Sequence, residues 1–172
     1  MIEIATIEDV EALNNLVHSA YRGETSKKGW TSEADLLGGI RTTKQSLLET
    51  IATPKTSLLK YTKDSEILGC VMLVEKENAL YLGMLTVSPD LQGGGIGKKL
   101  LQFAEIFAKE KHISTIEMTV ISVRTELIAW YERHGYIKTG ETKPFPMNDP
   151  NFGEPKQHLE FIVMEKGLGI RD

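Results

Sequence analysis

The sequence of residues 80–101 is LYLGMLTVSPDLQGGGIGKKLL, and this stretch decides the fold. Its first part, Leu80 to Val87, is apolar and β-prone, which predicts a buried strand. Pro89 ends that strand because proline has no N–H to donate to a ladder. After the glycines, apolar residues recur at the spacing of one helix face; they are Ile96, Leu100, Phe103 and Phe107. The stretch therefore predicts a strand, a glycine-rich turn and a helix, in that order.

This turn is predicted to bind a phosphate. The first N–H groups of a helix lack an internal partner, and the macrodipole adds about half a positive charge there. Glycines let the backbone approach a phosphate closely; here they are Gly93, Gly94, Gly95 and Gly97. Lys98 and Lys99 follow in the first helical turn, where the dipole alone disfavours cations. A bound polyanion explains these two lysines better than helix stability does.

Two common phosphate loops do not fit this turn. Five positions before Gly97, where a Walker loop needs glycine, the chain has Gln92, and Lys99 occupies the Ser/Thr position. The dinucleotide pattern fails because its third glycine is missing. The turn does satisfy Gln-x-x-Gly-x-Gly at Gln92, Gly95 and Gly97. In this it resembles the acyl-CoA pyrophosphate loop of the GNAT superfamily of N-acetyltransferases, although the motif alone also fits a helix that merely begins in glycines.

A second motif lies one helix and one strand farther along the chain. Residues 129–136, AWYERHGY, resemble a GNAT segment of Ala, an apolar residue, Tyr, Glu, a basic residue, any residue, Gly and an aromatic residue. The superfamily commonly has Asn seven positions before the tyrosine, where this chain has Arg124. Arginine only donates hydrogen bonds, whereas an Asn amide also accepts them. We therefore leave Arg124 out of the predicted cofactor contacts.

Apolar periodicity and turn residues along the whole chain predict the element order βααβββαβαββ. The predicted strands cover residues 1–5, 56–62, 66–75, 79–87, 114–121, 136–143 and 158–165. The four helices of this order cover residues 10–21, 43–52, 95–111 and 126–134, and a further short helix is expected over residues 33–37. The resemblance implies an α/β (α+β) acyl-CoA N-acyltransferase fold: a mixed sheet of about six or seven strands, about four helices, and central parallel strands that splay apart.

Length and composition are those of an ordinary globular chain. The 172 residues suit a single N-acetyltransferase domain over residues 1–172, since compact domains commonly have about 100–200 residues. A net charge of −4 argues against a general nucleic-acid binder and is compatible with a cationic substrate.

The cysteine content and hydropathy predict a cytoplasmic protein. The single cysteine, Cys70, lies in an apolar run and is expected to be free and buried, as suits a reducing compartment. No apolar run approaches the about 20 residues of a membrane span, and the N-terminus lacks the pattern of a signal peptide. No membrane partner is expected.

The resemblance implies transfer of an acetyl group from acetyl-CoA to a primary amine by direct attack through a tetrahedral intermediate. Tyr131 corresponds to the general acid, since a phenol stays protonated at neutral pH. The pantetheine arm would pair with backbone groups of Leu85, Thr86 and Val87. The pyrophosphate would be held by the turn, comprising Gln92, Gly93, Gly94, Gly95, Ile96, Gly97 and Lys98. No cluster has the spacing of metal ligands, so no metal is expected.

The acceptor is left open between a small molecule, a peptide N-terminus and a lysine. Its specificity is expected from residues 21–40 and 144–157; candidate contacts are Tyr21, Trp30, Glu33 and Asp35. The general base is a water chain or one of Glu33, Asp35, Glu75, His158 and Glu160. An acyl-CoA-binding module without turnover, or a phosphometabolite binder, remains an alternative function. A homodimer is possible.

Overall fold

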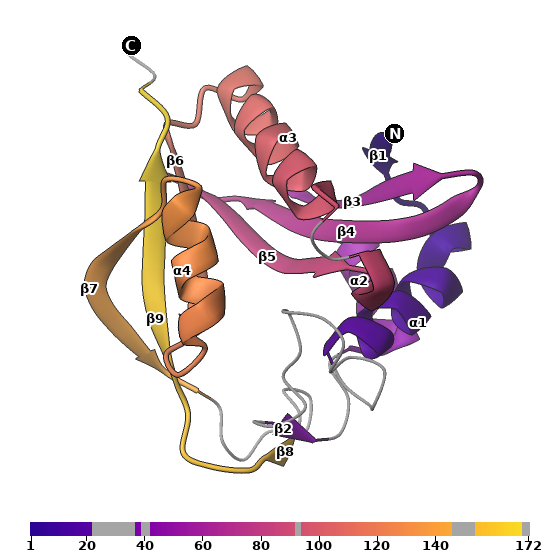
Figure 1. The fold of residues 1–172 in the computed structure, drawn as a ribbon. Coiled ribbons are helices and arrows are strands. Elements are labelled where there is room, and N and C mark those ends of the chain that lie inside the picture. Colours follow the sequence, from indigo (N-terminus) through magenta and orange to yellow (C-terminus); the bar gives the residue numbers. More distant parts are fainter. Residues whose placement is uncertain (22–36, 39–41, 92–93, 146–153, 170–172) are drawn as a thin grey trace.

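The computed structural model describes residues 1–21, 37–38, 42–91, 94–145 and 154–169 (Figure 1). Its helices are α1 (Val10–Tyr21), α2 (Lys44–Ala52), α3 (Ile96–Glu110) and α4 (Thr125–Arg133), with 3-10 turns at Ile7–Asp9 and Pro89–Leu91. Its strands are β1 (Ile2–Ile4), β2 (Leu37–Gly38), β3 (Thr56–Lys63), β4 (Glu66–Glu75), β5 (Leu80–Val87), β6 (Thr115–Ile121), β7 (Ile137–Pro144), β8 (Glu154–Pro155) and β9 (Glu160–Gly167). The predicted order of seven strands and four helices is confirmed, most boundaries move by one or two residues, and the short strands β2 and β8 are additional to the prediction.

The predicted helix over residues 33–37 is wrong at its last residue. Leu37 lies in β2, which pairs antiparallel with β8 through Leu37↔Pro155 and Gly38↔Glu154; residues 33–36 lie outside the described residues. The local sequence favours a helix, but a backbone partner more than 100 positions away determines the strand. No pattern of apolar residues within a short window reports such a pairing.

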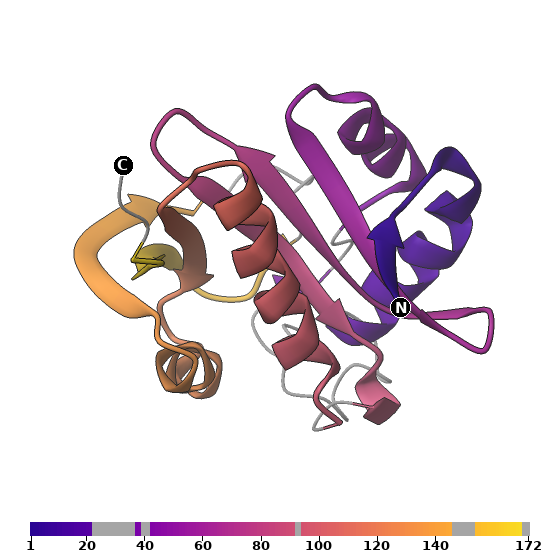
Figure 2. The ribbon, with the colours of Figure 1, turned by 90° about the horizontal axis from the view of Figure 1, so that it is seen from above.

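Seven strands form one open mixed sheet in the order β1-β3-β4-β5-β6-β9-β7. Figure 2 shows α1 and α2 on one side of this sheet and α3 on the other. The helices divide the core accordingly: α3 and α4 share one cluster with the centre of the sheet, and α1 and α2 share a second with β3 and β4. Cys70 forms no disulfide and is buried in that second cluster, as predicted.

The parallel neighbours β5 and β6 remain together for only two residue pairs, Leu80↔Ile116 and Tyr81↔Glu117. On its other edge β6 pairs with β9 along all seven of its residues. Beyond Tyr81 the two strands part (Figure 1), and we call this divergence the fork. The predicted splaying of the central parallel strands is therefore confirmed.

A β-bulge in β5 lies just beyond the start of the fork. Cys70 pairs with Thr86 and Met72 with Gly83, so one residue of β4 faces two of β5. Met84, one of those two, has a φ of 50°, in the left-handed region that a methionine rarely adopts. A bulge bends its strand and increases the local twist. Here the bend lies in the part of β5 that is no longer paired with β6.

The N-terminal segment is fixed to the sheet by a carboxylate. The Asp9 carboxylate accepts from the Thr6 N–H at 2.8 Å and pairs with Lys60 Nζ on β3 at 2.9 Å. Both charged side chains are about 15% exposed, so solvent screens this pair only in part. Burial alone raises the pKa of the Asp9 carboxyl, but the hydrogen bonds from Thr6 and Lys60, together with the lysine charge, outweigh it and lower the pKa.

The loss of stability caused by replacing Asp9 with Asn should depend on pH. Because the folded state lowers the pKa of Asp9, its contribution is present above the unfolded pKa and disappears as the pH falls through the folded pKa. We expect Asp9→Asn to reduce the free energy of unfolding by about 1–3 kcal/mol at pH 7, and by progressively less below about pH 4. Urea unfolding at pH 7 and pH 3 measures this, with exposed Glu8→Gln as the matched control. An equal loss at both pH values would contradict the assignment.

Candidate functional site

The start of α3 is built to bind an anion. Gly95 is the N-cap with φ 86°, a left-handed conformation that glycine adopts without strain. The first helical hydrogen bond runs from the Lys99 N–H to the Gly95 carbonyl at 3.0 Å. The N–H groups of Ile96, Gly97 and Lys98 therefore point out of the helix start, and the described residues offer them no acceptor. Three such donors at the positive end of a 15-residue helix favour a phosphate.

The apolar face of α3 fixes this start against the sheet. Ile96 and Leu100 are buried over β4, where a side chain on Gly69 would come within 3.0 Å of Ile96 and 3.2 Å of Leu100. The absence of a Cβ at Gly69 lets the helix lie close to the strand. Lys98 and Lys99 are exposed, and Lys99 Nζ lies 5.7 Å from the centre of the Tyr61 ring on β3. The predicted helix register is confirmed.

The helix start lies at the open end of the fork. Strands β5 and β6 are parallel and paired at the beginning of β5, so they part towards its end, from which the chain continues to α3. The predicted arm-binding residues occupy this last part of β5. Leu85, Thr86 and Val87 are buried, and β4 pairs with the latter two through Cys70 and Gly69.

Helix α4 brings Tyr131 into the same core cluster as β5 and the start of α3. Tyr131 is 6% exposed, and its ring meets those of Trp130 and Tyr136 edge-on at 5.3 and 5.8 Å. The helix begins after Arg124, whose carbonyl accepts from the Ile128 N–H at 3.0 Å. The two sequence motifs, about 35 residues apart, thus contribute side chains to one apolar cluster.

The sequence matches, over residues 36–146, the family profile described as an acetyltransferase (GNAT) domain. The chain belongs to the GNAT acetyltransferases. A curated relative, the amino-acid acetyltransferase of Ralstonia nicotianae, is 34% identical over 76 residues, or 43% of this chain. The match spans only 16% of that relative.

Solved GNAT structures share the fold. The ribosomal-protein-S18-alanine N-acetyltransferase of Escherichia coli superposes with a TM-score of 0.75 at 14% identity, covering 100% of this chain and 96% of that one. The PaiA N-acetyltransferase of Thermoplasma acidophilum, solved in complex with coenzyme A, gives 0.67 at 22% identity, covering 97% and 98%. Identities this low establish the architecture alone.

The described part of this GNAT domain also has a polar cluster at the vertex of the fork, which the sequence did not reveal. The Tyr81 hydroxyl on β5 lies 2.9 Å from the Thr119 hydroxyl on β6, two positions beyond the last residue pair. Lys76 Nζ lies 4.8 Å from the centre of the Tyr81 ring and 3.9 Å from the Glu117 carboxylate. Neither motif includes these positions, and their proximity depends on the register between β5 and β6.

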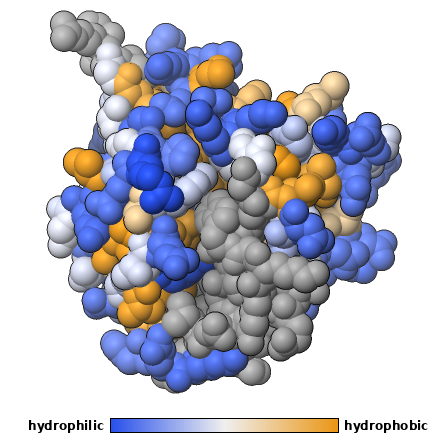
Figure 3. Space-filling model, in the orientation of Figure 1, coloured by the Kyte–Doolittle hydropathy of each residue, from blue (hydrophilic) through white to orange (hydrophobic). Residues whose placement is uncertain are grey.

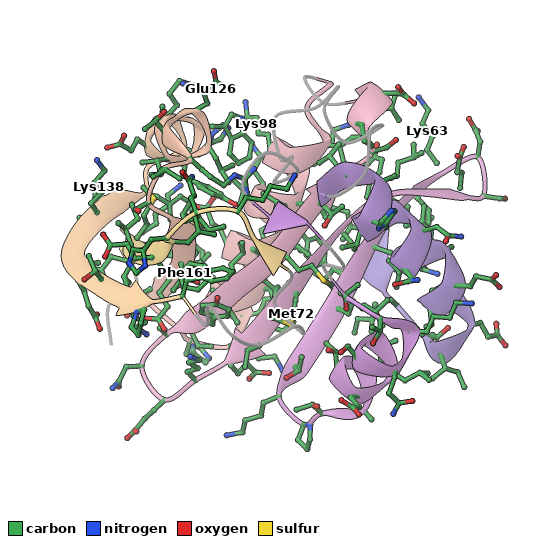
Figure 4. All side chains as sticks on the ribbon, turned by 90° about the horizontal axis from the view of Figure 1, so that it is seen from below. Lys63, Met72, Lys98, Glu126, Lys138 and Phe161 are labelled. Atoms are coloured by element: carbon green, nitrogen blue, oxygen red, sulfur yellow. The ribbon has the colours of Figure 1, made fainter. Side chains whose placement is uncertain are left out.

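The strands on either side of the fork add apolar side chains. Figure 4 labels Met72 on β4 and Phe161 on β9, the strands that flank β5 and β6. Phe161 is half-buried and its ring lies 5.1 Å from that of Phe145. On the face drawn in Figure 3, apolar side chains lie scattered among hydrophilic ones. Apolar side chains and a few polar groups therefore lie on the strands that form and flank the fork, a mixture that small-molecule sites also have.

Several predicted site residues lie outside the described residues: Gln92, Gly93, Trp30, Glu33 and Asp35. Tyr21 ends α1, and its side chain is likewise outside the description. Of the candidate bases that are described, Glu75 is half-buried, and His158 and Glu160 are exposed. The β2–β8 pairing does join the two segments predicted to determine the acceptor, residues 21–40 and 144–157.

Within the described ranges no group of three or more His, Cys, Asp or Glu side chains can hold a metal ion. None of the described helices has the length and hydropathy needed to cross a membrane.

A buried phenol adjoins Tyr131. Tyr136 is 2% exposed, and its hydroxyl has no hydrogen-bond partner among the described residues. Burial raises the pKa of Tyr136 well above its usual value of 10, and the negative charge of Glu105 raises it further. Lys166 Nζ lies 3.0 Å from the Glu105 carboxylate and donates to the His134 carbonyl at 2.9 Å, covering this corner of the core. The Tyr136 hydroxyl therefore keeps its proton and costs stability.

Replacing Tyr136 with Phe should leave the fold as stable or more stable. An unsatisfied buried hydroxyl costs about 1–3 kcal/mol, and this change removes it without opening a cavity. We expect the free energy of unfolding to stay level or rise by up to that amount. Tyr81→Phe is the matched control: the same atom is removed, but a hydrogen bond is lost, so a fall of about 0.5–1.5 kcal/mol is expected. Chemical denaturation measures both, and a larger loss for Tyr136→Phe would contradict this.

Proposed function

We propose that this GNAT acetyltransferase takes its acetyl group from acetyl-CoA and transfers it to a primary amine. The observation that carries the proposal is the glycine-capped start of α3 at the open end of the β5–β6 fork. A diphosphate suits the N–H groups of Ile96, Gly97 and Lys98, and Lys98 adds a positive charge. The fork gives an extended pantetheine arm a strand to lie along. The coenzyme A complex of the PaiA enzyme, which has the same fold, supports this.

The donor contacts that we propose follow the two motifs. The turn that holds the diphosphate comprises Gln92, Gly93, Gly94, Gly95, Ile96, Gly97 and Lys98. The end of β5 holds the arm through the backbone of Leu85, Thr86 and Val87. The bulge at Met84 supports this part of the proposal, because it alters the direction of the backbone amides just before Leu85. A backbone N–H directed at the thioester carbonyl would stabilise the oxyanion that forms there.

Tyr131 is proposed as the general acid. The amine nitrogen attacks the thioester carbonyl carbon, the C–N bond forms, and a tetrahedral oxyanion results. When the C–S bond breaks, the departing thiolate of coenzyme A takes the Tyr131 proton, while the amine loses its extra proton to water. Burial of Tyr131 on α4, in one cluster with β5, supports this role. Tyr131 is reprotonated from solvent between turnovers.

The acceptor is proposed to be recognised by the segments 21–40 and 144–157, with Tyr21, Trp30, Glu33 and Asp35 as contacts for a cationic amine. The β2–β8 pairing supports a shared role for the two segments, since it connects them directly. The printed names of similar proteins include acceptors of two sizes, an amino acid and a ribosomal-protein alanine. Both offer a primary amine, which is the chemistry that the proposal requires.

The proposal is tested in two steps. Isothermal calorimetry with acetyl-CoA should detect saturable binding to the full chain. A panel of amino acids, polyamines, aminoglycosides and peptides with free N-termini is then screened for acceptor-dependent release of coenzyme A thiol. Steady release with one class identifies the acceptor, whereas binding without any release would favour a module without turnover. Absence of binding would refute the proposal.

Reversing the charge of Lys98 should weaken the binding of coenzyme A. Glutamate there would place a negative charge beside the diphosphate and the positive end of the helix. We expect the Kd of coenzyme A to rise by about tenfold or more, which corresponds to about 1.4 kcal/mol. Lys109→Glu, a change of the same charge on the exposed face at the far end of α3, is the matched control and should leave Kd within about twofold. Equal effects of the two variants would place the anion elsewhere.

Removing the Tyr131 hydroxyl should slow the chemical step without weakening donor binding. We expect Tyr131→Phe to lower kcat by about 100-fold or more, because the thiolate must leave without a positioned proton donor. The Kd of acetyl-CoA, measured by calorimetry, should stay within about twofold of that of the unaltered protein. Tyr61→Phe on β3 serves as the control for a tyrosine outside the proposed machinery. An unchanged kcat in Tyr131→Phe would exclude Tyr131 as the acid.

A further inference from the structure

We propose that Tyr81 and Thr119 close the inner end of the fork and restrict the donor to short acyl groups such as acetyl. This inference rests on the proposed use of an acyl-CoA donor and concerns a property that neither sequence motif addresses, the length of the acyl chain. The observation behind it is the 2.9 Å contact between the two hydroxyls at the vertex.

The topology sets the direction in which the donor lies. The diphosphate-binding start of α3 follows the end of β5, at the open end of the fork. In an acyl-CoA the acyl group is at the opposite end of the pantetheine arm from the diphosphate. An arm that enters at the open end and follows β5 therefore carries its acyl group towards the vertex.

The vertex is closed on both faces of the sheet. On the face covered by α3 and α4, Leu82 and Met118 are the first residues beyond the paired ones, and each is 2% exposed within the core cluster. On the other face the Tyr81 ring extends forwards along β5, and its hydroxyl reaches Thr119 on β6. The side chains that follow the last residue pair thus block the space between the strands into which a longer acyl chain would extend.

Three contacts hold the Tyr81 ring in this position. The ring occupies the space above Gly83, where an added Cβ would lie 3.1 Å from a ring carbon and 3.1 Å from the end of the Met72 side chain. Lys76 Nζ lies over the ring at 4.8 Å. The hydroxyl is bonded to Thr119. A longer acyl chain would have to displace a side chain that is fixed on three sides.

The expected difference in affinity between acetyl-CoA and longer acyl-CoA donors is large, because a rigid boundary excludes extra methylene groups. One extra or missing methylene group changes the preference of a hydrophobic pocket between two ligands by about 10-fold to 200-fold. A flexible boundary would discriminate less. The boundary is rigid because the Tyr81 hydroxyl is bonded to Thr119, so the ring is held by a second strand.

Binding of three ligands to the full chain, without acceptor, tests the inference. Calorimetric titrations use free coenzyme A, acetyl-CoA and butyryl-CoA. The unaltered protein should bind butyryl-CoA about tenfold or more weakly than acetyl-CoA, and in Tyr81→Ala the two Kd values should differ by less than about threefold. Thr119→Ser keeps an oxygen within reach of the Tyr81 hydroxyl and should retain the discrimination. If Tyr81→Ala does not fold by circular dichroism, Tyr81→Leu is judged by the same criterion.

The outcomes separate this inference from the proposed function. Equal affinity of the unaltered protein for acetyl-CoA and butyryl-CoA, with free coenzyme A bound normally, overturns the inference alone. If Tyr81→Ala weakens all three ligands by the same factor, the contact merely ties the strands together, and the inference is again overturned. Failure of free coenzyme A to bind the unaltered protein overturns both the proposed function and the inference.

Discussion

The candidate site depends on two parallel strands that stop pairing after two residues. If β5 and β6 paired continuously, the backbone of each strand would bond to the other along its whole length, as β6 and β9 do. Their divergence instead ends the pairing between β5 and β6 at the side where the chain turns into α3. The helix start, the end of β5 and Tyr131 all contribute side chains to one apolar core cluster. Each of these features alone is common in proteins.

The divergence is compatible with a stable protein because each half of the sheet is complete by itself. Strand β5 is paired with β4 along most of its length, and β6 is fully paired with β9. Helix α3 then covers the first half with six buried residues, and burial of each large apolar side chain contributes about 1.5–3 kcal/mol. The anion-binding end of α3 is consequently held by its apolar face, so the polar end need not contribute to packing.

Local sequence patterns predicted the elements, whereas long-range register determined the contacts at the vertex. The strand from Leu80, the glycine turn and the helix from Ile96 were predictable because apolar spacing and glycine content are properties of a short window. The Tyr81–Thr119 contact and the β2 strand at Leu37 depend on partners 38 and 118 positions away, since 119 − 81 = 38 and 155 − 37 = 118. Only the folded backbone brings such residues together. The family resemblance supplied the splaying of the strands, which no residue pattern in this chain encodes by itself.

Met84 marks a bend in the part of β5 that is no longer paired with β6. Among the described residues, the other non-glycine positions with positive φ, Lys55, Asp64, Ser65 and His112, all lie in turns. Met84 alone lies within a strand, and a left-handed methionine costs about 1–2 kcal/mol. The surrounding pairs, Cys70↔Thr86 before the bulge and Met72↔Gly83 after it, hold it in that conformation. Gly83, immediately beside it, leaves the space that the Tyr81 ring fills. The left-handed residue therefore bends β5 within the fork, and its glycine neighbour leaves room for the Tyr81 ring at the vertex.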